Sequence, residues 1–197
     1  QFKRYISGLL VSENKTISGI NQLFVAEPRS QSSLNRFLIK SPFSLETLNR
    51  SRLEMLESVP RTRIKPTKGV LSFDDTLLTH YGKDFDKIAL LWDHTKHYYT
   101  WAHNLVSLHY SDEQTDYPID FQLWEPADLE KLEEGLPKAG VKLRESKFAL
   151  KTEDPLAWRQ YLLGVWSRKQ KKTEVAALYQ SKLLIAKALL IAWVQNN

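Results

Sequence analysis

The sequence contains no cysteine. Disulfide bonds and thiolate metal sites are therefore excluded, which suits a protein of the reducing cytosol. Without cysteine, a zinc site would need several converging histidines. His103 and His109 share one face of an expected strand, but six strand residues separate them by roughly 20 Å. The histidines therefore do not predict a zinc site, and the stretch WDHTKH, which contains His94, is interpreted as a turn.

Long apolar runs are also missing. The most apolar stretch, Leu183 to Val194, is shorter than the ~20 residues that span a bilayer, and Lys187 interrupts it. No secretory signal begins the chain. We expect this stretch to be a buried helix, and the protein to be cytoplasmic and without a membrane partner.

Acidic residues are scarce in the first third of the chain. Residues 1–68 contain 12 Lys and Arg against 5 Asp and Glu, whereas residues 69–197 contain 16 against 18. Clustered cations favour polyanions such as DNA, because they release condensed counterions. A solvated basic surface would have the same composition.

Residues 1–60 contain four helix-sized segments and predict a helical bundle. The fourth, SLETLNRSRLEMLESV, has Ser44 as its N-cap and leucines at helical spacing. The second and third, TISGINQLF and SQSSLNRFLI, are separated by Pro28 and could form a helix-turn-helix. A packing module without DNA contacts would show the same pattern. The residues expected to contact DNA from this region are Arg29, Ser32, Asn35, Arg36, Lys40, Arg50 and Arg52.

The segment RTRIKPTK, residues 61–68, is interpreted as a basic linker. Its Arg61, Arg63 and Lys65 are candidates for phosphate contacts. A linker that is merely solvated would look the same.

From residue 69 the pattern changes to strands. VLSFDD, residues 97–111 and residues 116–124 are rich in β-favouring residues and predict a three-stranded antiparallel meander. Helices are expected next: PADLEKLEEG, then a helix capped by Asp154 with Pro155 at its first position, and a long helix from about Lys172 to Gln195. The fold class is therefore α+β or α/β.

Asp74 and Asp75 follow an apolar run, at the expected end of the first strand. Neighbouring strand residues point to opposite faces, so one acid is expected to be functional and the other a structural partner. Carboxylates are hard oxygen ligands for Mg²⁺ or Mn²⁺. Alternatively, both acids could cap a turn with Thr76.

Several motifs in order resemble one family. These are SPF with LNRSRL, then FDDT, WDH, HNLVSLHY and YPIDF. From about Ser33 onward the chain resembles bacterial insertion-sequence transposases of the DDE class, in the branch with a DDT first-acid motif. The resemblance implies a nucleoid-associated protein that cleaves and joins DNA at the ends of a mobile element.

The resemblance also implies a fold and a site. Residues 69–197 would form the first half of an RNase H-like domain, in which two Asp and one Glu bind two divalent metals, Mg²⁺ or Mn²⁺. The Asp before Thr76 matches the first acid, so Asp75 is assigned as catalytic and metal-binding, with Asp74 held as its alternative.

The second Asp and the Glu of the family have no counterpart at matching positions. Asp112, Asp116 and Asp120 precede the long helix, whereas the family's second Asp follows it. The resemblance therefore implies an N-terminal transposase fragment that binds DNA and does not cut it alone. Its partners would be terminal inverted repeats, target DNA and a second copy in a homodimer. The alternatives are a non-catalytic DNA-binding regulator and an inactive remnant.

Overall fold

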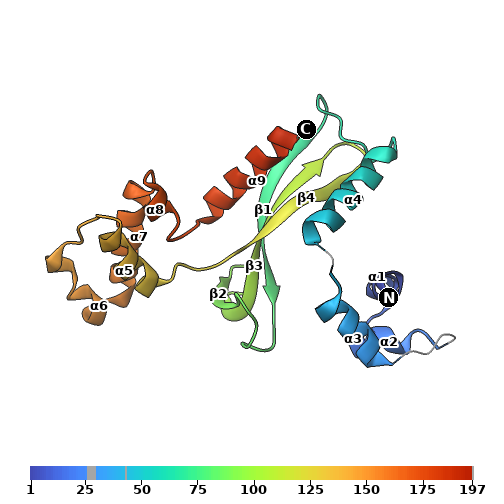
Figure 1. Ribbon diagram of the computed structural model, residues 1–197, viewed down its shortest axis with the longest axis horizontal. Helices are drawn as coiled ribbons and strands as arrows, with labels where there is room; N and C mark the ends of the chain where they lie inside the picture. Colours follow the sequence, from blue (N-terminus) through green and yellow to red (C-terminus); the bar gives the residue numbers. More distant parts are fainter. Residues whose placement is uncertain (26–29, 43, 197) are drawn as a thin grey trace. The chain divides into compact units, whose positions relative to one another are not determined.

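The structure is a computed structural model that describes residues 1–25, 30–42 and 44–196 (Figure 1). The chain divides into two compact units, Gln1–Arg52 and Leu53–Asn197. Arg29, one of the expected DNA contacts, lies outside the described residues, as does Pro28.

The first unit is helical, as expected. Its elements are α1 (Phe2–Val11), α2 (Ile17–Gln22), α3 (Gln31–Lys40) and the beginning of α4 (Leu45–Ser58). Thr16 caps α2, because its hydroxyl accepts from the backbone N–H of Gly19 at 3.1 Å. The predicted cap of α4 is confirmed, since the Ser44 hydroxyl accepts from the N–H of Thr47 at 3.2 Å.

Close packing holds α1 against α2. A Cβ at Gly8 would stand 2.2 Å from Cγ2 of Ile20, so only glycine allows this approach. Ile20 and, on α3, Leu34 are buried. These contacts pack the described helices of the first unit together. The predicted turn at Pro28 lies outside the described residues, so the helix-turn-helix stays a prediction.

The second unit contains a four-stranded antiparallel sheet. Its strands are β1 (Val70–Thr79), β2 (Ala89–Asp93), β3 (Tyr98–Ser111) and β4 (Asp116–Trp124). The long strand β3 is central: β1 pairs along one edge, and the registers place β2 and β4 one after the other along the opposite edge (Figure 1). The predicted antiparallel meander of β1, β3 and β4 is confirmed, but β2 is an additional strand.

Helix α9 (Lys182–Asn196) covers one face of this sheet (Figure 1). Alternate residues of β3 point at it, as the two-residue period of a strand requires. They pack with residues one turn apart on the helix. The buried cluster consists of Val106, Leu108, Tyr110, Tyr117, Ile119, Ile185 and Leu189.

Helices after the sheet enclose a second core. The elements are α5 (Leu129–Lys138), a 3-10 turn (Glu145–Lys147), α6 (Leu150–Glu153), α7 (Pro155–Lys169) and α8 (Thr173–Ala176). The buried cluster includes Leu132, Leu136, Trp158, Leu162 and Trp166. The predicted start of α7 is confirmed, since the Asp154 carboxylate accepts from the N–H of Ala157 at 2.9 Å.

The prediction of one continuous helix from Lys172 to Gln195 was wrong, because residues 177–181 separate α8 from α9. Tertiary contacts cause the break. The Trp166 indole donates to the carbonyl of Val175 at 3.0 Å, and Leu178 packs against Gly135, where a Cβ would stand 2.4 Å from Cδ2. The Ser181 hydroxyl then accepts from the N–H of Leu184 at 3.3 Å and starts the new helix.

The described chain is therefore a mixed helix and antiparallel-sheet protein, with helices before and after the strands. This order is consistent with a DDE nuclease fold. Across the described residues, no helix combines the length and the apolar character that crossing a membrane requires.

Candidate active site

Asp74 and Asp75 lie in the middle of β1. Asp74 pairs with Ser107 and Asp75 with Val106 on β3, so the two carboxylates point to opposite faces, as expected. Their predicted position at the strand end was wrong. The pairing continues to Thr79, because the Thr and Leu residues that follow also favour a strand.

The carboxylate of Asp75 lies on the face covered by α9. Its Oδ2 accepts from the side-chain amide of Asn104 at 3.0 Å and from the ammonium of Lys182 at 2.5 Å. Asn104 is buried, whereas the Asp75 side chain is 48% exposed. The Asp75 carboxylate is therefore held by a buried amide and remains accessible to solvent.

Lys182 is fixed by more than this ion pair. Its ammonium lies 4.8 Å from the ring centroid of Trp124, which is a cation–π contact. The Trp124 indole in turn donates to the Tyr179 hydroxyl at 3.2 Å. The amide of Gln122 donates to Gln180 at 2.8 Å. The residues preceding α9 are thus attached to the end of β4.

These contacts keep Asp75 ionised. The hydrogen bond from Lys182, and next that from Asn104, lower the pKa of Asp75 below its ordinary value. The charge of His94 contributes a smaller lowering of the same pKa. His94 follows β2 in the predicted turn, which is confirmed: the Asp93 carboxylate accepts from the N–H groups of Thr95 at 2.9 Å and Lys96 at 3.1 Å.

Asp74 has a different environment. Its Oδ1 accepts from the backbone N–H of Asp75 at 2.9 Å. The hydroxyl of Ser107 donates to its carbonyl at 3.4 Å. Asp74 therefore points away from Asn104 and Lys182, to the opposite face of the sheet from Asp75.

The residues around Asp75 do not fit a two-metal site. Within residues 1–25, 30–42 and 44–196, no three side chains of the His, Cys, Asp and Glu types come together in a metal-binding group. A two-metal centre needs several carboxylates, but here one carboxylate oxygen accepts from an ammonium and an amide. This geometry supports no metal-dependent step.

The expected DNA contacts on α3 share one exposed face. Ser32, Asn35, Arg36 and Lys40 follow the helical period and are exposed, while Leu34 is buried on the other side. The Arg36 guanidinium donates to the carbonyl of Ser32 at 3.3 Å.

On α4, Arg50 is exposed. Arg52 is partly buried, and its guanidinium donates to the side-chain oxygen of Asn49 at 2.8 and 3.1 Å. These cations lie in the first unit, with α3.

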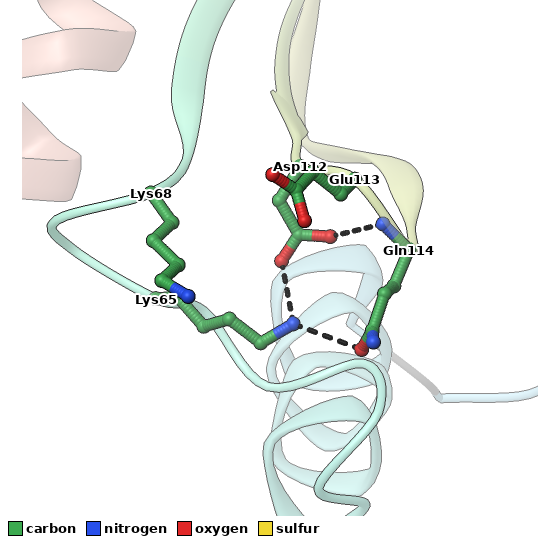
Figure 2. Close-up of a pocket in the computed structure, with 5 residues that line it drawn as sticks. All are labelled: Lys65, Lys68, Asp112, Glu113 and Gln114. Atoms are coloured by element: carbon green, nitrogen blue, oxygen red, sulfur yellow. Dashed lines mark hydrogen bonds and ion pairs between the residues drawn. The ribbon is translucent and has the colours of Figure 1, made fainter.

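In the basic linker, Arg61 is exposed and Arg63 donates to the carbonyl of Glu57 at 3.0 Å. Lys65 is engaged: its ammonium lies 3.0 Å from Asp112 and 3.1 Å from Gln114 (Figure 2).

Lys68 and Glu113 complete the lining of a shallow pocket of about 150 Å³ at this place (Figure 2). The side chain of Asp112 is only 2% exposed, and its carboxylate forms an ion pair with the ammonium of Lys65. The geometry makes Lys65 an anchor of the linker on the sheet.

The sequence prediction missed Asn104 and Lys182. The sequence did contain a signal for Asn104. It lies two residues before Val106 and four before Leu108, so it shares their buried face of the strand, and a buried polar side chain needs a hydrogen-bond partner. Lys182 offered no signal, because its contact with Asp75 spans 107 residues and depends on where α9 begins.

Comparison with known proteins identifies the family. Residues 1–160 match the family model of the DDE superfamily endonucleases. This span contains the helices of the first unit, the sheet of the second unit and Asp75, and it ends before Lys182. No curated protein and no solved structure matches the chain. Members of this superfamily generally act on DNA with divalent metals. By this match, which covers most of its length, the chain belongs to the DDE superfamily endonucleases.

Proposed function

We propose that this protein serves DNA transposition at insertion-sequence ends, and that the chain supplies DNA binding and the first catalytic carboxylate. The observation that carries the proposal is Asp75. It is the DDT-motif acid within the matched residues, and it is ionised, half exposed and oriented by Asn104. An ionised, solvent-accessible carboxylate is what a family that handles DNA phosphates with divalent metals requires.

The polar face of α3 supports the part of the proposal that concerns DNA. Arg36 and Lys40 are exposed cations one turn apart, and Ser32 and Asn35 are neutral hydrogen-bonding groups beside them. Such a face can neutralise phosphates and reach base edges. The partners would be terminal inverted repeats and target duplex, with a second copy in the complex.

The assembled enzyme would use Mg²⁺ or Mn²⁺. In this proposal Asp75 would be one ligand of that site, and the described residues contain no group of three or more His, Cys, Asp or Glu side chains that could complete it. Asn104 holds the carboxylate in one orientation, so its amide limits which oxygen faces solvent.

The test is a binding and cleavage assay on the purified chain with a duplex of an element end. We expect binding at 50 mM salt that weakens steeply by 200 mM, because counterion release drives it. With Mg²⁺ or Mn²⁺ we expect no cleavage above that of the Asp75→Asn variant. Absence of salt-dependent binding would overturn the DNA role, and Asp75-dependent nicking would show that the catalytic acids are complete.

A second candidate is a DNA-binding regulator without catalysis. The Asp75–Lys182 ion pair favours it, because a carboxylate already neutralised by lysine is a poor start for a metal centre. Mixing the chain with an intact family member in a transposition assay separates the two. Inhibition in proportion to added chain supports the regulator, and unchanged transposition excludes it.

A further inference from the structure

We propose that residues 167–172 form a second DNA-contacting surface, which binds the phosphates of a duplex whatever its base sequence. Its cations are Arg168, Lys169, Lys171 and Lys172, and we call these six residues the basic segment. The segment includes the end of α7 and leads into α8 (Figure 1). This inference rests on the proposed function, which makes DNA the partner. The basic segment lies beyond residues 1–160, so the family match does not include it.

Positive charge is concentrated in the basic segment. From residue 69 onward the chain has 16 Lys and Arg against 18 Asp and Glu. Four of those cations nevertheless occupy six consecutive positions, with no acid among them, and all four residues are exposed. Such a local excess of cations attracts a polyanion, and salt weakens the attraction.

The four cations are free of internal ion pairs. None of them lies within ion-pair distance of a carboxylate in the described parts of the chain. Two other lysines of the helices after the sheet are paired, because Lys138 lies 3.2 Å from Glu134 and Lys151 lies 3.0 Å from Glu133. The basic segment can therefore bind an external anion without breaking a contact of the fold.

The fold holds the backbone of the basic segment in place. Trp166, directly before it, is buried, and its indole donates to the carbonyl of Val175 at 3.0 Å. Within the segment, the N–H of Lys172 donates to the carbonyl of Lys169 at 3.0 Å. The backbone is therefore ordered before DNA binds, so binding costs less conformational entropy than it would for a flexible tail.

The chemistry of the basic segment suits phosphates better than bases. Three of its four cations are lysines, which act on phosphate as point charges and carry no sequence information in such contacts. The exposed face of α3 differs, because Ser32 and Asn35 lie beside its cations and can reach base edges. We therefore expect the basic segment to add affinity for any duplex.

The experiment measures duplex binding by the whole chain, using fluorescence anisotropy from about 50 to 200 mM salt. The double variant Lys171→Ala, Lys172→Ala removes two cations that follow the end of α7, and neither side chain caps a helix. We expect the slope of log K against log salt to fall by about 2. The fall should be equal on an element end and on an unrelated duplex of the same length.

The matched control is the double variant Lys83→Ala, Lys131→Ala. It makes the same charge change in the second unit, at two exposed lysines without an ion pair among the described residues. Its slope should stay within that of the wild type. Thermal unfolding checks that both double variants fold, and Lys171→Gln with Lys172→Gln replaces the alanine pair if that pair melts lower.

Three results would overturn the proposal. The first is a wild-type slope in the Lys171 and Lys172 variant, and the second is an equal fall in the control. The third is a loss confined to the element end, which would mean base readout instead of phosphate binding.

Failure of this inference can be told from failure of the proposed function. A wild type that binds duplex, with an unchanged slope in the Lys171 and Lys172 variant, removes the basic segment and leaves the DNA role intact. A fall in that variant with no effect of Arg36→Ala keeps the basic segment and removes the contact from α3. A wild type without salt-dependent binding overturns both.

Discussion

The ammonium of Lys65 lies 3.0 Å from Oδ2 of Asp112, although 47 residues separate them in the chain. The hydroxyl of Tyr110 donates to the same carboxylate oxygen at 2.9 Å, and it accepts from the backbone N–H of Lys65 at 2.9 Å. Three groups thus join the linker to the turn after β3. This network predicts how the second unit responds to acid.

The pKa of Asp112 is held well below its usual range, first by the N–H of Gln114 and next by Lys65. A lowered folded-state pKa stabilises the fold above the pKa of the unfolded chain, about 3.9, and the stabilisation is lost as the pH falls further. We expect the melting temperature of the wild type to drop steeply below about pH 5. Asp112→Asn should melt lower at pH 7 and depend less on pH, measured by thermal unfolding from pH 3 to 7. An equally steep dependence in the variant would contradict this assignment.

The contact of α9 with the sheet depends on Ile185, which is 1% exposed. Ile185→Ala should lower the free energy of unfolding of this unit by about 2–5 kcal/mol, because it leaves a cavity between helix and sheet. Urea unfolding followed by near-UV circular dichroism measures the loss. Leu183→Ala on the same helix is the control, since Leu183 is 83% exposed and its removal should change the free energy by less than about 0.5 kcal/mol.

Gly69 lies against the ring of Tyr110, where a Cβ would stand 2.0 Å from Cε2. The ring is buried and its hydroxyl makes two hydrogen bonds, so it cannot move aside. Gly69→Ala should destabilise the unit by about 1–3 kcal/mol in thermal or urea unfolding. Gly82→Ala, where the nearest atom is 3.5 Å away, should be neutral. Equal stability of both variants would rule out the clash.

The exposed face of α3 predicts two phosphate contacts. Arg36→Ala and Lys40→Ala should each weaken duplex binding and reduce the slope of log K against log salt by about 1, measured by fluorescence anisotropy. Lys142→Ala, an exposed lysine of the second unit, is the control and should leave the slope unchanged. If Lys142→Ala has the same effect as the α3 variants, the binding surface lies elsewhere.

Local patterns predicted much of the fold. The caps Ser44 and Asp154 and the β-favouring composition of β3 are local features, so they could be predicted from the sequence. The five-residue β2 was missed, because so short a run carries little period-two signal. The break between α8 and α9 was missed because it depends on the distant Gly135.

The candidate site was predictable only where it depends on local sequence. Asp75 stands in a motif and faces opposite to Asp74, as strand geometry requires. Its partner Lys182 comes from the start of α9, and the predicted continuous helix would have given that lysine no special position. Long-range contacts of this kind depend on tertiary packing, which local sequence does not determine.

Lys182, Ile185 and Leu189 follow one another at helical spacing along α9, and the latter two are buried against the sheet. The packing of Ile185 and Leu189 against the sheet therefore fixes the rotation of α9 about its axis. That rotation determines the direction from which Lys182 reaches Asp75. A slide of α9 by one residue would turn its first side chain by about 100°. Packing of buried apolar side chains thus determines the position of an ion pair that is exposed to solvent.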